Sequence, residues 1–144
     1  MKGTNDLLHV CAYKTASGFF VFDTFVNWIL GILFLFFYKP VESLIADSKL
    51  IPDAGWLMIG AGLFLFGIWQ TFILIKGKLI KGALLFSSIM AYAPVLLLTF
   101  GLFIAGPRIH FAAALAIWAG NLYMLALGTI YLVAYLKIIK LARL

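Results

Sequence analysis

The residue of this sequence best suited to chemistry is Asp23, which lies in an apolar stretch with Asn27 four residues further on. Residues four apart share one face of a helix, so the carboxylate and the amide are predicted to be neighbours. A carboxylate inside a membrane segment is costly and usually faces the interior of a bundle or water. Such a pair is suited to binding a proton or a polar ligand group.

Further polar side chains fall at a similar depth when the apolar segments of the chain cross the membrane in turn. The predicted polar layer consists of Asp23, Asn27, Gln70, Ser87, Ser88 and Tyr131. In a functional interpretation this layer is a proton or ligand site. In a structural interpretation Asp23 lies at the level of the lipid headgroups, and the other residues form hydrogen bonds between helices. We favour the structural interpretation, because Asp23 is only about a turn inside the apolar boundary of its segment.

Residues that bind metals or act as nucleophiles are sparse. The two histidines, His9 and His110, are expected on opposite sides of the membrane, so they cannot bind one metal ion or haem within a chain. Cys11 is the single cysteine, whereas a disulfide or a thiol-based quinone oxidoreductase needs a pair. No nucleophile–base pair is visible. We therefore expect no cofactor and no metal site, and we favour a non-enzymatic role while leaving an enzyme open.

The composition indicates that lipid is the solvent for most of the chain. Of the 144 residues, 65% are hydrophobic and 11% are charged, against roughly 45–50% and about 25% in soluble domains. A soluble fold of this length has too much surface for its volume to bury that apolar content. The basic residues that give the net charge of +6 lie at the ends of apolar runs. This placement is typical of membrane proteins and does not indicate nucleic-acid binding.

Four apolar segments predict a single all-α domain over residues 1–144, an antiparallel bundle of transmembrane helices. Each segment reaches the roughly 20 residues that cross a bilayer, and helices satisfy the backbone within it. The predicted spans are 17–38, 56–75, 81–105 and 110–136. The first connection predicts a short helix on the membrane surface, beginning at Pro40. The other two connections are short, so the second, third and fourth spans are expected to be antiparallel neighbours.

The distribution of Lys and Arg predicts the orientation of the bundle. Eight of the eleven fall on the side that holds both termini and the second connection, and three fall on the other side. Cytoplasmic segments of membrane proteins carry the excess of positive charge, so both termini are expected in the cytoplasm.

Small residues in the fourth span predict close helix contact. Ala112, Ala116 and Gly120 recur every four residues, and Gly128 follows further along. A stripe of this kind lets another helix approach closely, either within the chain or from another subunit. We favour packing within the chain. Asn121 is expected to form a hydrogen bond across to another helix.

The stretch FVNWILGILFLF at residues 25–36, a Pro-containing connection and then IGAGL at 59–63 resemble small four-span bacterial membrane proteins of the DoxX-like kind. The resemblance covers the first half of the chain and the four-span plan. It implies a location in the bacterial inner membrane. DoxX-type proteins include a subunit associated with thiosulfate–quinone oxidation, but no catalytic motif is shared, so no catalytic residue is implied.

Two functions remain open at this point. The favoured one is a small non-catalytic membrane protein, an accessory subunit or a self-associating module whose partners are the lipid bilayer and a second copy or another membrane protein. The alternative is a proton-coupled transporter, or a quinone- or lipid-binding redox component, that uses the layer around Asp23. A water-accessible cavity that reaches Asp23 would favour the alternative.

Overall fold

The computed structural model describes residues 2–76, 79 and 81–141, with side chains from Tyr13 to Ile138, and most of this part of the chain is helical. The elements in order are α1 (Lys2–Phe36), α2 (Tyr38–Ile45), α3 (Asp53–Ile75), α4 (Lys81–Ala105), the 3-10 turn η1 (Gly106–Arg108) and α5 (Phe111–Leu141). Four of these helices, α1, α3, α4 and α5, are long and apolar enough to cross a membrane. The predicted all-α fold with four such helices is confirmed.

The helix bounds follow the predicted spans closely in the middle of the chain and extend beyond them at its two ends. α4 covers 81–105 as predicted. α3 begins at Asp53, three residues before the predicted start at 56, with Pro52 at its N-cap position. α1 starts at Lys2, before the predicted span that begins at 17. The short helix after the first span is present as α2 and begins two residues before Pro40.

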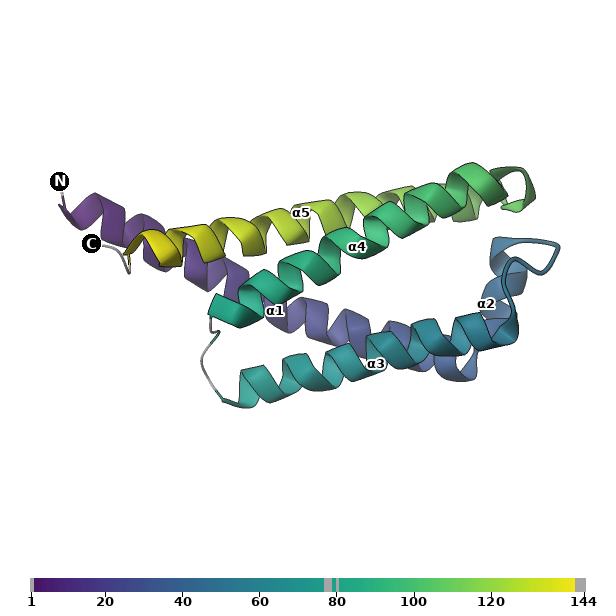
Figure 1. The fold of residues 1–144 in the computed structure, drawn as a ribbon, viewed down its shortest axis with the longest axis horizontal. Coiled ribbons are helices and arrows are strands. Elements are labelled where there is room, and N and C mark those ends of the chain that lie inside the picture. The colour runs from purple at the N-terminus through teal and green to yellow at the C-terminus, as the bar shows by residue number, and fades with distance from the viewer. Residues whose placement is uncertain (1, 77–78, 80, 142–144) are drawn as a thin grey trace.

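The bundle consists of two helix pairs, α1 with α3 and α4 with α5 (Figure 1). α3 and α4 are antiparallel, as their short connection predicts, but they are not a closely packed pair (Figure 1). Phe66 and Trp69 of α3 touch Phe86 of α4 through their rings, but the main partner of α3 is α1. A short connection makes two helices antiparallel without fixing how closely they pack.

Glycines explain why α1 and α3 form a pair. A Cβ atom added to Gly31 would lie 2.8 Å from the backbone nitrogen of Phe64, and one added to Gly60 would lie 2.7 Å from that of Leu35. The two backbones therefore approach each other more closely than any side chain would allow. Close backbone approach is the main source of attraction between helices in lipid.

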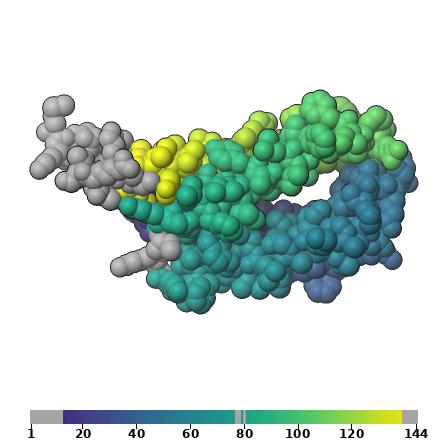
Figure 2. All heavy atoms as spheres, in the orientation of Figure 1, coloured from purple at the N-terminus to yellow at the C-terminus, as the bar shows by residue number. Residues whose placement is uncertain are grey.

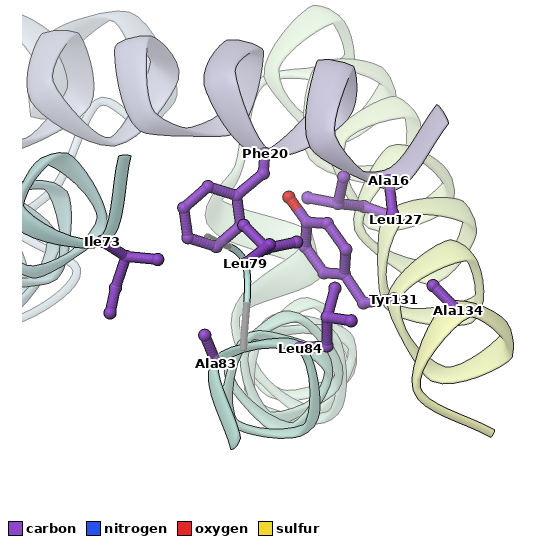
Figure 3. Packing of buried hydrophobic residues seen from close by; sticks show 9 residues of the cluster. All are labelled: Ala16, Phe20, Ile73, Leu79, Ala83, Leu84, Leu127, Tyr131 and Ala134. Carbon is purple, nitrogen blue, oxygen red and sulfur yellow. The ribbon is translucent and has the colours of Figure 1, made fainter. Parts of the chain in front are cut away.

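The two pairs meet in the half of the bundle where α1 begins and α5 ends, which we call the terminal end. A cluster of buried side chains from α1, α3, α4, α5 and the α3–α4 connection fills it (Figure 3). Phe20 and Tyr131 form its centre, with ring centroids 6.0 Å apart. The connection is fixed there by Tyr13, whose hydroxyl accepts a hydrogen bond from the Leu79 amide at 3.0 Å.

At the opposite end the two pairs separate, and Figure 2 shows an opening between α3 and α4. The part of α4 beside it is exposed on several sides, including Leu96, Leu97 and Phe100. The segment from Leu44 to Asp47, which we call the strap, crosses from α2 to the start of α5 at this end. Ala46 pairs with Ile109 there in an isolated antiparallel bridge.

The glycine contact yields a first prediction. Gly60→Ala should lower the stability of the protein by about 1–3 kcal/mol, because the added methyl group collides with the backbone of α1. Gly62→Ala is the matched control, since a Cβ at Gly62 meets nothing within 4 Å. That control should be neutral or stabilising by up to about 1 kcal/mol, because Ala favours a helix over Gly. Thermal melting in detergent measures both, and equal melting temperatures would contradict the contact.

Candidate polar site between the helix pairs

Asp23 and Gln70 form the central contact of the polar layer. The Gln70 side-chain amide donates a hydrogen bond from Nε2 to Asp23 Oδ2 at 2.6 Å, and Asn27 donates from Nδ2 to Gln70 Oε1 at 2.9 Å. All three side chains are buried. The amide of Gln70 thus donates to one residue of α1 and accepts from another, and it ties α1 to α3 at two points one helical turn apart.

Tyr131 brings the second helix pair to the same carboxylate. Its hydroxyl donates to Asp23 Oδ2 at 3.5 Å, a long hydrogen bond. The phenol oxygen points from α5 toward α1, beside Phe20 (Figure 3). One carboxylate oxygen therefore receives hydrogen bonds from α3 and from α5, which belong to different pairs.

The two serines of α4 lie in the same half of the bundle but have different surroundings. Ser88 donates from Oγ to the Gly128 carbonyl of α5 at 3.0 Å. Ser87 is buried, and its hydroxyl has no hydrogen-bond partner. The structure describes no contact from either serine to Asp23. Ser88 belongs to the α4–α5 contact, and Ser87 is an unpartnered polar group beside the layer.

Asp23 is buried among the helices, and its depth relative to the lipid headgroups stays a prediction. The side chain is 3% exposed. The other half of the structural interpretation, hydrogen bonds between helices, is what the geometry shows.

The small residues of α5 do two different things. Gly128 packs within the chain, where an added Cβ would lie 3.0 Å from the ring of Tyr92. Ala112, Ala116 and Gly120 are exposed, and a Cβ on Gly120 meets nothing within 4 Å. Packing within the chain is therefore the wrong prediction for these three. They lie at the end of α5 where α1 has diverged from it.

Asn121 forms the predicted contact between helices. It donates from Nδ2 to Thr99 Oγ1 on α4 at 3.1 Å, while its Oδ1 has no partner. The sequence did not single out several other buried polar contacts. Trp28 donates from Nε1 to Thr71 Oγ1 at 3.0 Å, and Thr24 donates to the Phe20 carbonyl at 2.7 Å. A hydroxyl four residues after a carbonyl in a helix is the pattern that identifies the second of these.

His110 has contacts that the sequence gave no reason to expect. Its ring lies between the Leu44 carbonyl and the Asp47 carboxylate of the strap. These contacts raise its pKa above the usual value, with the carboxylate making the larger contribution. The side chains of His9 and Cys11 lie outside the described residues. Among the residues described, no group of three or more His, Cys, Asp or Glu side chains is placed to hold a metal ion.

These observations define a class: an all-α bundle of four apolar helices with a hydrogen-bonded polar layer in one half. No family model matches the chain, and neither a curated protein nor a solved structure matches it. Chemically, the layer holds one carboxyl group surrounded by amide and phenol donors. A carboxyl group can bind a proton, and the donors of Gln70 and Tyr131 are already hydrogen-bonded to it.

The layer yields a second prediction. Asp23→Leu should lower stability by about 1–2 kcal/mol, because it leaves the buried Gln70 amide without an acceptor. Asp23→Asn should be nearly silent, since it keeps an acceptor oxygen and the size of the side chain. The double variant Asp23→Leu with Gln70→Leu should recover part of the loss, because both hydrogen-bonding partners are removed together.

Thermal melting or denaturant titration in detergent provides the measurement. If Asp23→Leu melts at the same temperature as Asp23→Asn, the hydrogen bond to Gln70 does not contribute to the fold.

Proposed function

We propose that this protein is a small non-catalytic membrane protein that assembles with another transmembrane helix, as a self-associating module or as an accessory subunit. The observation that carries the proposal is the uncovered small-residue face of α5. Gly120, Leu127 and Ala134 follow one another at seven-residue intervals and so lie along one face of the helix. Leu127 and Ala134 are buried in the core of the terminal end, whereas Gly120 is exposed.

The same face of α5 thus changes its surroundings along its length. At the terminal end it packs in the core with α1, and toward the strap it continues as Ala116 and Ala112 with no helix over it. Small side chains permit close approach of a second backbone, as Gly31 and Gly60 do inside this chain. A helix from a second copy of the chain has the right character to cover this face.

Burial of the polar layer supports a non-catalytic role. Asp23 is buried and hydrogen-bonded to Gln70, and Gln70 in turn to Asn27. Interhelical hydrogen bonds of this kind stabilise a bundle and fix the register of its helices. The alternative, a proton-coupled transporter or a quinone- or lipid-binding component, is supported by the unpartnered hydroxyls of Ser87 and Tyr123. In that alternative the Asp23→Asn protein folds normally and loses the pH dependence of transport or ligand binding.

We further propose a bacterial inner-membrane location with both ends of the chain in the cytoplasm. The charge asymmetry supports this orientation, and the likeness of residues 25–36 and 59–63 to DoxX-like proteins supports the location. The start of α1 and the end of α5 lie at the same end of the bundle (Figure 1).

Self-association is tested by disulfide crosslinking in native membranes. Ala116→Cys in a Cys11→Ser background should form a crosslinked dimer on mild oxidation, and adding Gly120→Leu should reduce the crosslinked fraction several-fold. Gly101→Leu, at an exposed α4 position where an added Cβ also meets nothing, is the matched control and should leave the crosslink unchanged. Absence of the dimer from the Ala116→Cys protein rejects self-association, and the covering helix then has to belong to a different chain.

Orientation is tested by thiol labelling of intact cells. A single cysteine at Ser48, in the exposed connection after the strap, should react with a membrane-impermeant maleimide added from outside. Three Lys or Arg residues on that side against eight on the other motivate the expectation. Labelling only after the membrane is broken would reverse the orientation.

A further inference from the structure

The strap contacts the start of α5 through the backbone bridge between Ala46 and Ile109 and through His110, which makes three contacts of its own. Its backbone amide donates to the Ile45 carbonyl at 2.8 Å. On the ring, Nδ1 lies 3.1 Å from the Leu44 carbonyl oxygen, and Nε2 lies 3.1 Å from Asp47 Oδ1. The strap consists of the last two residues of α2 and the two residues after them, and it belongs to the α1–α3 pair, whereas His110 directly precedes α5. The ring therefore joins the two helix pairs at the end where they have separated.

Both partners of the imidazole ring are hydrogen-bond acceptors. A carbonyl oxygen and an ionised carboxylate cannot donate, so each ring nitrogen has to carry a proton to bond with its partner. A neutral imidazole carries one N–H and satisfies only one of the two. The complete set of contacts at His110 thus belongs to the protonated, positively charged ring.

The charged groups around His110 leave Asp47 as its partner. On α2, Glu42 accepts the Leu50 amide at 3.0 Å, and after the strap Lys49 pairs with Asp53 at 2.6 Å. Arg108 on η1 carries a positive charge two residues before His110. The ring also stands at the start of α5, where the helix dipole disfavours a cation. The strap therefore favours the protonated form of the ring, whereas the dipole of α5 disfavours it.

We propose that His110 is a pH-controlled latch, whose protonated ring binds the strap through both nitrogens and gives up one of these two contacts when it loses its proton. The backbone contacts of the strap with α5, from the His110 amide to Ile45 and between Ala46 and Ile109, do not depend on this proton. Loss of the ring contact leaves the strap less tightly bound to α5, so that the opening between α3 and α4 (Figure 2) can widen.

The direction of the pH effect follows from the pKa of His110. The Asp47 carboxylate and the Leu44 carbonyl raise this pKa in the folded protein. The stabilising contribution of the latch is therefore complete below the ordinary histidine pKa of about 6.5 and is lost as the pH rises through the raised value. Asp47 is 95% exposed and His110 is 38% exposed, so salt weakens the carboxylate contact.

Distance measurements between spin labels test the latch in lipid nanodiscs. Labels go on Leu57→Cys of α3 and Phe103→Cys of α4, both exposed positions near the strap, in a Cys11→Ser background. At a pH of about 5.5, below the ordinary histidine pKa, we expect one narrow distance. At a pH of about 8.5, above it, the distribution should broaden toward longer distances. His110→Gln should give the broad distribution at both pH values.

Two further variants make the test specific. Asp47→Asn keeps an acceptor oxygen but removes the charge, so the midpoint of the transition should move to lower pH. Lys49→Gln with Asp53→Asn removes the neighbouring ion pair and should leave the midpoint unchanged. The proposal is overturned if the distances do not change with pH in the parent protein, or if the change persists in His110→Gln.

Discussion

The hydrogen bond from Gln70 to Asp23 is the interaction on which the arrangement of the bundle depends. A carboxylate in an apolar segment has to find donors, because hydrocarbon offers none and an unsatisfied polar group there is costly. Gln70 supplies a donor from α3, and Tyr131 supplies one from α5. The need to satisfy one oxygen atom therefore brings three helices together at a fixed depth and in a fixed rotation, and it joins the two helix pairs.

The terminal end and the strap end differ because attraction between helices in lipid is local. Lipid tails are as apolar as leucine side chains, so burying apolar surface between helices gains little there. What remains is close backbone contact and polar pairing. The α1–α3 pair has Gly31 and Gly60 along its contact, and the terminal end has the layer around Asp23. Between the pairs at the strap end, the structure describes the contacts of His110 and the backbone bridge between Ala46 and Ile109.

Hydropathy and charge were sufficient to predict the spans, and helical periodicity was sufficient to group most of the polar residues. The span at 81–105 coincides with α4, and every member of the predicted layer is buried. The sequence did not predict which helices form pairs, because the length of a connection does not determine how closely the two helices that it joins pack together. The strap contacts of His110 link residues 66 positions apart, and no local pattern indicates them.

The two ends of the bundle are held together by different kinds of contact. Buried hydrogen bonds join the helices at the terminal end. The carboxyl group among them, that of Asp23, is shielded from water by side chains of α1, α3 and α5. At the strap end the joining group is an exposed histidine, whose charge changes near neutral pH. The uncovered face of α5 with Ala116 and Gly120 lies at this second end. The end of the bundle where the two helix pairs separate is therefore also the end where the small-residue face of α5 is exposed.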